Sequence, residues 1–304
     1  MKRFVIRVMM VVCLALSTLT ILPAQSPDFS FGIVADIQYA DKLASGNRAY
    51  AASLNKLDAC IAGWNSSPLA FTIQLGDIID GNSSPATTMQ DLQQVLYAFD
   101  KLRHRHYHVV GNHCFSVERD ILLPQLSLDR GWYSFVHEGR RFIILDSMDI
   151  SLQGRQPGSA KHDRALAYLE AHPKAKKYSG GLGDEQKAWL AEQLQLASRR
   201  GEKVMIFSHH PMYSPLKSES ELMWDAAEIR ALIDSYDCVA VAFSGHHHEG
   251  GYGVLKGIHY VTLEGMVVSP ESGNAYGTVD VYEDRIEITG IGELTSRVLQ
   301  FGGE

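Results

Sequence analysis

Apolar runs and amphipathic stretches alternate through the first part of the chain. Phe29 to Ala35 is almost wholly apolar, which predicts a buried strand. The stretch from Arg48 to Trp64 repeats its large apolar residues at helical spacing, which predicts an amphipathic helix. Polar residues follow each predicted strand, at the edge where α/β sheets bind ligands. This part of the pattern predicts strands at 29–35, 69–75 and 107–110 and helices at 48–64 and 89–102.

The pattern changes after residue 131. Two short apolar segments meet at Glu138-Gly139, which predicts a hairpin. Residues 147–183 are polar and glycine-rich apart from a short helix near 163–170, and such a long irregular segment favours a functional loop or lid. With no linker in the chain, we expect one α/β domain of two mixed sheets with helices outside. The remaining predicted elements are helices at 183–200 and 221–235 and strands at 132–136, 140–146, 204–208, 239–244, 258–263, 278–282 and 285–289.

The first 24 residues differ from the rest. They start with two basic residues, are mostly apolar up to Leu22, and end in Pro23-Ala24. This order is typical of a secretory signal peptide. The alternative is an uncleaved membrane anchor, but Arg7 interrupts the apolar stretch. We therefore expect a signal peptide at 1–24, a domain at 25–304, and an exported protein, periplasmic or secreted, with no stable membrane span.

The charge of the chain narrows the class of partner. The 304 residues carry a formal net charge of −7, and removal of Lys2, Arg3 and Arg7 with the signal peptide would make it −10. An acidic balance argues against a general nucleic-acid binder. It leaves an anionic small molecule open as the partner, because bound divalent cations can reverse the field inside one cleft. The oligomeric state is not fixed by these features.

Two acidic motifs follow the first two predicted strands. Asp36 and Gln38 stand two residues apart and offer a carboxylate and an amide oxygen, which suit a hard divalent cation. In the next motif, Asp77 can bridge two cations, and Asp80 can orient a neighbouring acid or base. Each motif alone is equally well explained as a polar turn after a strand.

Two further motifs follow later strands. Asn112 offers an amide oxygen, and His113 offers an imidazole whose ordinary pKa suits proton transfer. His209 directly follows a predicted strand and can reach a metal, whereas the next residue, His210, is interpreted as a structural or outer neighbour. Each motif alone could be a turn that carries a surface histidine.

The run of three histidines after Gly245 is the most informative motif. On an extended segment, His246 and His248 point to one side and can serve two adjacent ions, while His247 points away. Oxygen and nitrogen donors without a thiolate favour manganese, iron, zinc or magnesium. The combined set predicts two divalent cations, one held by Asp36, Gln38, Asp77 and His248 and the other by Asp77, Asn112, His209 and His246.

This ordered set resembles the calcineurin-like metallophosphoesterase superfamily. Most members have Asp-x-His at the first motif, and Gln38 departs from that pattern. With Gln38 at this position, the chain is similar to a narrower group, the manganese-dependent ADP-ribose/CDP-alcohol diphosphatases. The likeness is strong in FGIVADIQYAD at 31–41, QLGDIIDG at 74–81 and GHHHEGGY at 245–252, and weak across 147–183.

The resemblance implies a fold and an activity. The fold is a four-layer α-β-β-α sandwich. The implied activity is hydrolysis of the phosphoanhydride of ADP-ribose or a CDP-alcohol by a hydroxide that bridges two cations, and the resemblance favours manganese as the metal. His113 would donate a proton to the leaving oxygen while Asp80 holds its ring. Tyr39 could stack on a base or simply pack in the core, and weaker candidates for substrate contact are Arg48, Trp132 and Tyr133.

Two other functions remain open at this stage. The same binuclear core could belong to a phosphomonoesterase or a cyclic-nucleotide phosphodiesterase. The chain could also be a secreted metal-binding protein without activity, although the complete ligand set and the presence of His113 argue against it.

Overall fold

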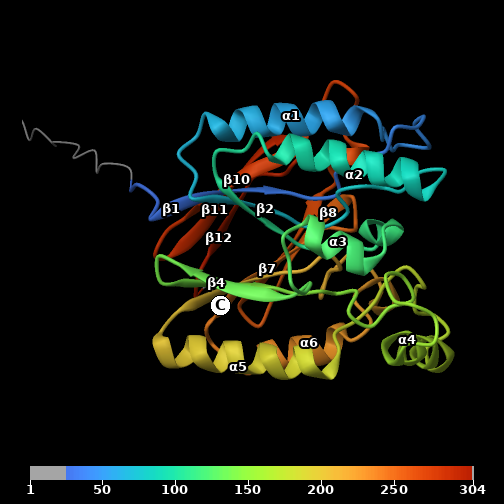
Figure 1. The fold of residues 1–304 in the computed structure, drawn as a ribbon. Coiled ribbons are helices and arrows are strands. Elements are labelled where there is room, and N and C mark those ends of the chain that lie inside the picture. Colours follow the sequence, from blue (N-terminus) through green and yellow to red (C-terminus); the bar gives the residue numbers. More distant parts are fainter. Residues whose placement is uncertain (1–24, 303–304) are drawn as a thin grey trace, which may run out of the picture.

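Two six-stranded sheets lie face to face in this computed structural model, which describes residues 25–302 (Figure 1). In spatial order, the first sheet contains β12 (Arg297–Gln300), β11 (Arg285–Gly292), β10 (Ala275–Val281), β1 (Phe29–Val34), β2 (Phe71–Gln74) and β3 (Arg105–His108). The second contains β4 (Tyr133–His137), β5 (Arg140–Ile144), β6 (Lys203–Phe207), β7 (Val239–Ser244), β9 (Ile258–Glu264) and β8 (Glu249–Leu255).

Both sheets are mixed. In the first, β1, β2 and β3 are parallel, and β10, β11 and β12 continue from β1 in antiparallel pairs. In the second, β5, β6, β7 and β9 are parallel, with β4 and β8 antiparallel at the two edges. Parallel strands in both sheets therefore bring their carboxyl ends to common edges, which is the arrangement that the sequence motifs require.

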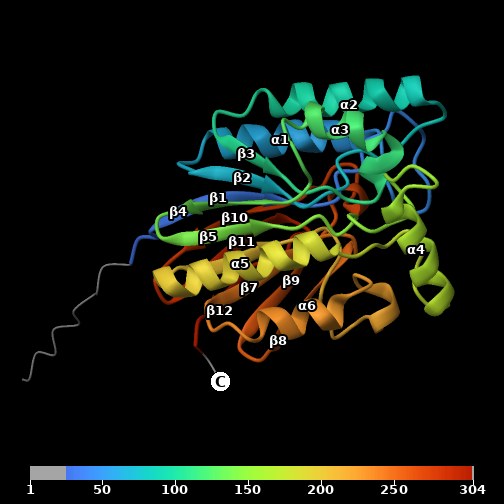
Figure 2. The ribbon, with the colours of Figure 1, turned by 60° about the horizontal axis from the view of Figure 1, so that its bottom comes forward.

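Helices cover the outer face of each sheet (Figures 1 and 2). The first sheet lies under α1 (Ala52–Asn65), α2 (Pro85–Phe99) and α3 (Arg119–Gln125), and the second lies against α5 (Asp184–Arg200) and α6 (Ala226–Ile233). A further helix, α4 (Ala160–Ala171), stands at the end of the sandwich toward which β1 and β2 run (Figure 1). The expected α-β-β-α order of layers is confirmed.

Three apolar layers hold the four structural layers together. The central one, between the sheets, is rich in phenylalanine: the rings of Phe31 and Phe71 are 5.2 Å apart, and those of Phe207 and Phe243 are 5.3 Å apart. The outer two lie under the helices, where Trp64 of α1 is fully buried against the first sheet. Burying a large apolar side chain contributes about 1.5–3 kcal/mol, so these layers make the sandwich a firm support for its loops.

Several element boundaries differ from the sequence expectation. The first helix begins at Ala52 rather than Arg48, because Arg48 forms a tight turn in which its backbone exchanges hydrogen bonds of 3.0 and 3.1 Å with Ser45. The second helix begins at Pro85, four residues earlier than expected, because Ser84 accepts a hydrogen bond from the Thr87 backbone and caps it. Helix α6 begins at Ala226 rather than residue 221. The pattern missed α3, β8 and β12 altogether.

The expected signal peptide at 1–24 lies outside the described residues and stays a prediction. Among residues 25–302, no helix is both long and apolar enough to cross a membrane.

Candidate metal centre

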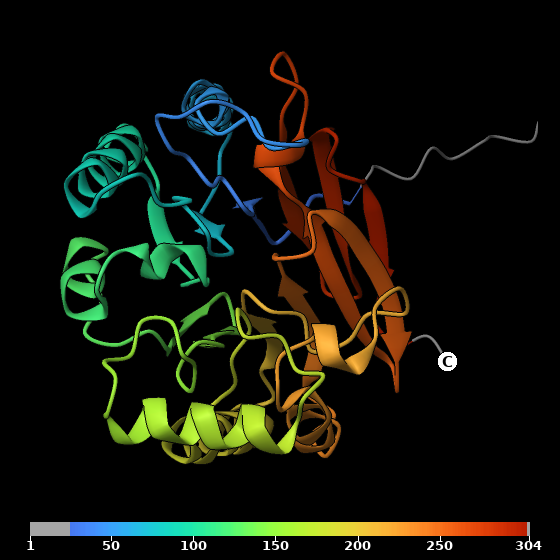
Figure 3. The same ribbon diagram turned by 90° about the vertical axis from the view of Figure 1, so that its right-hand side faces the viewer.

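The sequence-predicted ligands meet at the carboxyl ends of parallel strands from both sheets (Figure 3 views the molecule from that end). Asp36 follows β1, Asp77 follows β2 and Asn112 follows β3. His209 follows β6 and His246 follows β7 in the facing sheet. The first sheet thus brings most of the oxygen donors, and the second brings the imidazoles.

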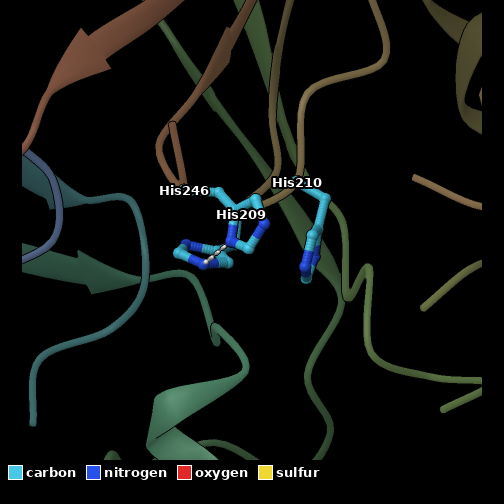
Figure 4. A group of neighbouring side chains, drawn as sticks. All are labelled: His209, His210 and His246. Carbon is cyan, nitrogen blue, oxygen red and sulfur yellow. Dashed lines mark hydrogen bonds between the residues drawn. The ribbon is translucent and has the colours of Figure 1, made fainter. Parts of the chain in front are cut away.

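One group of donors surrounds the His209 ring. Its Nε2 atom lies 3.2 Å from Asp77 Oδ2 and 3.1 Å from Asn112 Oδ1. The same Nε2 atom lies 3.2 Å from His246 Nδ1, the contact that Figure 4 marks. These four residues are the ones that the sequence predicts around one of the two ions.

The second group lies beside the first and shares Asp77. His248 Nε2 lies 3.3 Å from Asp36 Oδ1, and Gln38 Nε2 donates a 3.2 Å hydrogen bond to Asp77 Oδ2. Asp77 therefore touches members of both groups, as a carboxylate that bridges two cations must. The structure brings all seven side chains together, and the role of each as a ligand stays a prediction.

Four of these residues have unusual backbones. The φ angles of Asp36, Gln38, Asp77 and His246 are +52°, +42°, +52° and +70°, in the left-handed region that residues other than glycine seldom adopt. Such residues cost on the order of 1–3 kcal/mol each and persist where the surroundings fix them. Here a 2.7 Å hydrogen bond from Gln38 N to Asp77 O ties two of them together. The strain turns the side chains toward a common point.

This backbone corrects one expectation. The segment from His246 to His248 is not extended, because His246 is left-handed. His246 and His248 still both reach the site, whereas His247 Nε2 lies 3.1 Å from the carbonyl oxygen of Glu221.

Two glycines make room for the ligands. A Cβ atom on Gly76, whose φ is +94°, would lie 2.5 Å from His209 Nδ1. A Cβ atom on Gly245 would lie 2.6 Å from Asp36 Oδ2. The close approach at Gly76 also lets His209 Nδ1 donate to the Leu75 carbonyl at 2.9 Å. That bond leaves the Nε2 lone pair free to bind a metal.

The donor chemistry fits divalent cations. Among residues 25–302, the buried atoms Asp36 Oδ1 and Gln38 Oε1 have no hydrogen-bond partner, and buried oxygens rarely lack one. Burial and the neighbouring His210 and His209 rings hold the pKa of His246 well below its ordinary value, so it is the neutral imidazole that metals bind. Burial opposes ionisation of Asp77, but His209 and His113 outweigh it and hold its pKa below the usual range.

His113 lies beside the metal centre without joining it. Its Nδ1 atom is 2.9 Å from Asp80 Oδ1, and its backbone N–H donates to Asp77 Oδ1 at 2.8 Å. Burial would lower the pKa of His113, but the carboxylates of Asp77 and Asp80 outweigh that effect and raise it to about 9. The backbone carbonyl oxygen of Asp80 also lies 3.2 Å from His113 Nδ1. Asp80 therefore holds the Nδ1 edge of the ring and leaves Nε2 as the nitrogen that can meet a substrate.

Two further residues, His210 and Cys114, lie near the centre. His210 Nε2 is buried without a hydrogen-bond partner in residues 25–302, and its ring lies 4.2 Å from that of His246 (Figure 4). It groups with His209 and His246 as a further possible donor. Cys114 is fully buried, and burial raises the pKa of its thiol to about 12, so no thiolate is available there.

The mouth of the site contains side chains that sequence reasoning mostly missed. Tyr39 is only 8% exposed and packs in the core, so it is not the aromatic surface considered for a base. Tyr178, from the irregular 147–183 segment, is 43% exposed and its ring lies 5.4 Å from His246. Lys42 and Arg48 both approach Asp80. Only proximity in the fold could reveal these contacts.

Comparisons with known proteins agree with this geometry. Residues 29–250 match the family model described as calcineurin-like phosphoesterase. A Bos taurus protein named manganese-dependent ADP-ribose/CDP-alcohol diphosphatase is 34% identical, over 91% of this chain and 95% of its own. An Oryza sativa protein of the same name is 33% identical, over 91% and 96%. A crystal structure of a dimetal phosphatase from Danio rerio superposes with a TM-score of 0.85 at 29% identity, over 91% of this chain and all of that one.

Proposed function

Because the chain belongs to the calcineurin-like phosphoesterase family, we propose that it is a manganese-dependent diphosphatase acting on ADP-ribose, CDP-alcohols or similar nucleoside diphosphate derivatives. The support is the likeness to relatives of that name over more than nine tenths of both chains. The aligned stretch spans the irregular 147–183 segment as well as the metal motifs.

One structural observation carries the hydrolase chemistry: two donor groups share Asp77, with His113 held beside them. The two groups would hold two divalent cations, which supply Lewis-acid stabilisation of the phosphoryl oxygens and a water of lowered pKa when bound. The protein itself holds the metal-binding side chains in place near the ends of the strands. The buried oxygens of Asp36 and Gln38 that lack a hydrogen-bond partner support this role, because they are available to bind a cation.

The reaction also needs a proton at the leaving oxygen. In hydrolysis of a phosphoanhydride, the oxygen of water bonds to one phosphorus, and the bond from that phosphorus to the bridging oxygen breaks. The bridging oxygen leaves with the second phosphate. His113 Nε2 can donate a proton to it or stabilise its charge, because Asp80 already occupies Nδ1. Products are a nucleoside monophosphate and a second phosphate ester.

The experiment is hydrolysis of ADP-ribose by the purified protein after metal removal and after addition of manganese. We expect manganese-dependent release of AMP and ribose 5-phosphate in equal amounts. AMP and cyclic AMP, tested as substrates under the same conditions, should be cut far more slowly. Faster cleavage of AMP would identify a phosphomonoesterase, and faster cleavage of cyclic AMP a cyclic-nucleotide phosphodiesterase. A protein that takes up manganese but cuts no phosphoester would be the inactive metal-binding protein.

We further propose that the protein is exported and that residues 1–24 are removed as a signal peptide. Three features of the sequence support this: the basic residues at the start of the chain, the apolar stretch that follows them, and the small or apolar residues before position 25. Mass spectrometry of the protein recovered outside the cytoplasm should find Gln25 at its amino terminus. Recovery of the intact residues 1–24 on the exported protein would overturn this proposal.

A further inference from the structure

We infer that Lys42 and Arg48 form a binding site for the second phosphate of a diphosphate substrate, the phosphate that departs as the leaving group. This inference rests on the proposed function, and it adds two residues that would distinguish a diphosphate from a single phosphodiester. It follows from how three side chains share the carboxylate of Asp80.

The Asp80 carboxylate is the meeting point of three nitrogen-bearing groups. His113 Nδ1 lies 2.9 Å from Oδ1, and Arg48 Nη1 lies 3.8 Å from the same oxygen. Lys42 Nζ pairs with Oδ2 and also donates to the Gly81 carbonyl at 2.8 Å. Lys42 and Arg48 are therefore held next to the ring that would meet the leaving oxygen.

The charges at this point do not balance. Lys42 and Arg48 bring two permanent positive charges, whereas Asp80 brings one negative charge and also has to serve His113. The Asp80 side chain is 8% exposed, but those of Lys42 and Arg48 are 32% and 35% exposed. The surplus positive charge thus faces solvent at the mouth of the site, where an anion can reach it.

The loop that carries both cations is held in place. Arg48 and Ser45 exchange two backbone hydrogen bonds, and the next residue, Ala49, donates to the Val267 carbonyl at 2.9 Å. Lys42 lies over the ring of Tyr50 at 4.3 Å from its centre, and Tyr50 is buried. Cations positioned before the ligand arrives lose less conformational freedom on binding, so they bind an anion more effectively.

There is space for the rest of a leaving group beside these cations. An open pocket of about 410 Å³ is lined by Asp80, Gly81, Asn82, Ser83, Ser84, Pro85, Thr88 and Ser116. Asp80 and Gly81, which form part of its wall, are the two residues that accept hydrogen bonds from Lys42 Nζ. The pocket lining is mostly polar, which suits the sugar or alcohol that a leaving phosphate bears.

The position relative to His113 decides which phosphate is bound. In a displacement at phosphorus, the attacking and leaving oxygens lie on opposite sides of the phosphorus atom. If His113 serves the leaving oxygen, the group that departs lies on the His113 side. Lys42 and Arg48 contact the Asp80 carboxylate, which holds the same ring at its Nδ1 atom. A phosphate monoester leaves with extra negative charge, and two cations there would stabilise it.

The test compares two substrates in the manganese-loaded full protein: ADP-ribose, whose leaving group is a phosphate, and bis(4-nitrophenyl) phosphate, whose leaving group has none. For Arg48→Gln and for Lys42→Gln, we expect the ratio of kcat/KM for ADP-ribose to kcat/KM for the aryl ester to fall about 10-fold, the effect of losing one charge-assisted contact. Arg48→Lys should restore part of the ratio. Lys101→Gln is the matched control, because Lys101 pairs with Asp58 on an exposed surface.

A second measurement does not need turnover of any diphosphate. Inhibition of aryl-ester hydrolysis by α,β-methylene-ADP, a diphosphate that resists cleavage, should weaken about 10-fold in Arg48→Gln, while inhibition by AMP changes much less. If both substrates lose activity equally, and both inhibitors weaken equally, Lys42 and Arg48 merely position Asp80 and the inference is wrong. If the wild type fails to cut ADP-ribose, but Arg48→Gln still weakens inhibition by α,β-methylene-ADP more than inhibition by AMP, the proposed substrate is wrong and the phosphate site stands.

Discussion

The metal centre and the mouth that surrounds it are built in different ways. The centre consists of residues that lie within a few positions of the ends of strands in both sheets, and Asp36, Asp77 and His209 are fully buried. The mouth consists of loop side chains such as Lys42, Arg48 and Tyr178, each about a third or more exposed. The strands fix the chemistry, and the loops are free to vary around it. Substitutions should therefore separate the two regions by what they change: metal content in one, substrate preference in the other.

The largest effect is expected at the residue shared by both donor groups. In Asp77→Asn, the bridging charge between two cations is lost, so we expect metal content to fall and turnover to drop on the order of 10³-fold or more. Metal analysis and ADP-ribose hydrolysis measure the two effects. Asp58→Asn, at an exposed carboxylate, is the control. If the variant binds two ions and keeps normal turnover, Asp77 is not a metal ligand.

A somewhat smaller loss should come from the residue between the two regions. His113→Gln keeps a polar side chain near Asp80 but cannot donate a proton as an imidazolium does, so kcat should fall about 10²-fold or more. The metal content should stay at the wild-type value, because His113 contacts Asp77 through its backbone N–H, which the substitution retains. A variant that loses its metal as well would show that this ring belongs to the metal centre.

The same contrast explains what the sequence alone could predict. Asp36 and Asp77 follow the buried strands β1 and β2, whose apolar patterns are clear, so the polar residues after them stand out and must meet at one sheet edge. The histidine run at 246–248 was equally visible, although its left-handed backbone was not. Register and ligand geometry needed the fold, because nothing local reveals that His209 Nε2 lies 3.2 Å from Asp77.

Most of the mouth could not be predicted from the sequence, for a physical reason, and Arg48 was only a weak candidate. Lys42, Arg48 and Tyr178 lie on loops without periodicity, and their partners are far away in the chain. The helical pattern predicts a helix from Arg48, but Arg48 closes a turn with Ser45 and the helix begins only at Ala52. Tyr39 is next to a predicted ligand in the sequence, yet its side chain packs in the core. Adjacency in sequence is a poor guide once the regular elements end.

The smallest effect is expected at Tyr178, which tests the boundary of the two regions. Its ring touches His246, a predicted ligand, but it comes from the 147–183 segment and is 43% exposed. The segment is held over the site by Trp224, whose Nε1 atom donates to the Lys176 carbonyl at 3.0 Å and whose backbone N–H donates to that of Gly180 at 2.8 Å. The ring is thus positioned by protein contacts that do not involve the metal centre.

If Tyr178 belongs to the mouth, its ring serves the substrate rather than the ions. Tyr178→Ala should then raise KM for ADP-ribose about 2- to 10-fold, because an aromatic contact contributes about 0.5–1.5 kcal/mol, and metal content should not change. Tyr178→Phe should keep the wild-type KM, since it keeps the ring. A loss of metal in Tyr178→Ala that Tyr178→Phe restores would show that the ring supports His246. In that case the centre would extend into the irregular segment, and the division between fixed chemistry and variable loops would not hold at this point of the molecule.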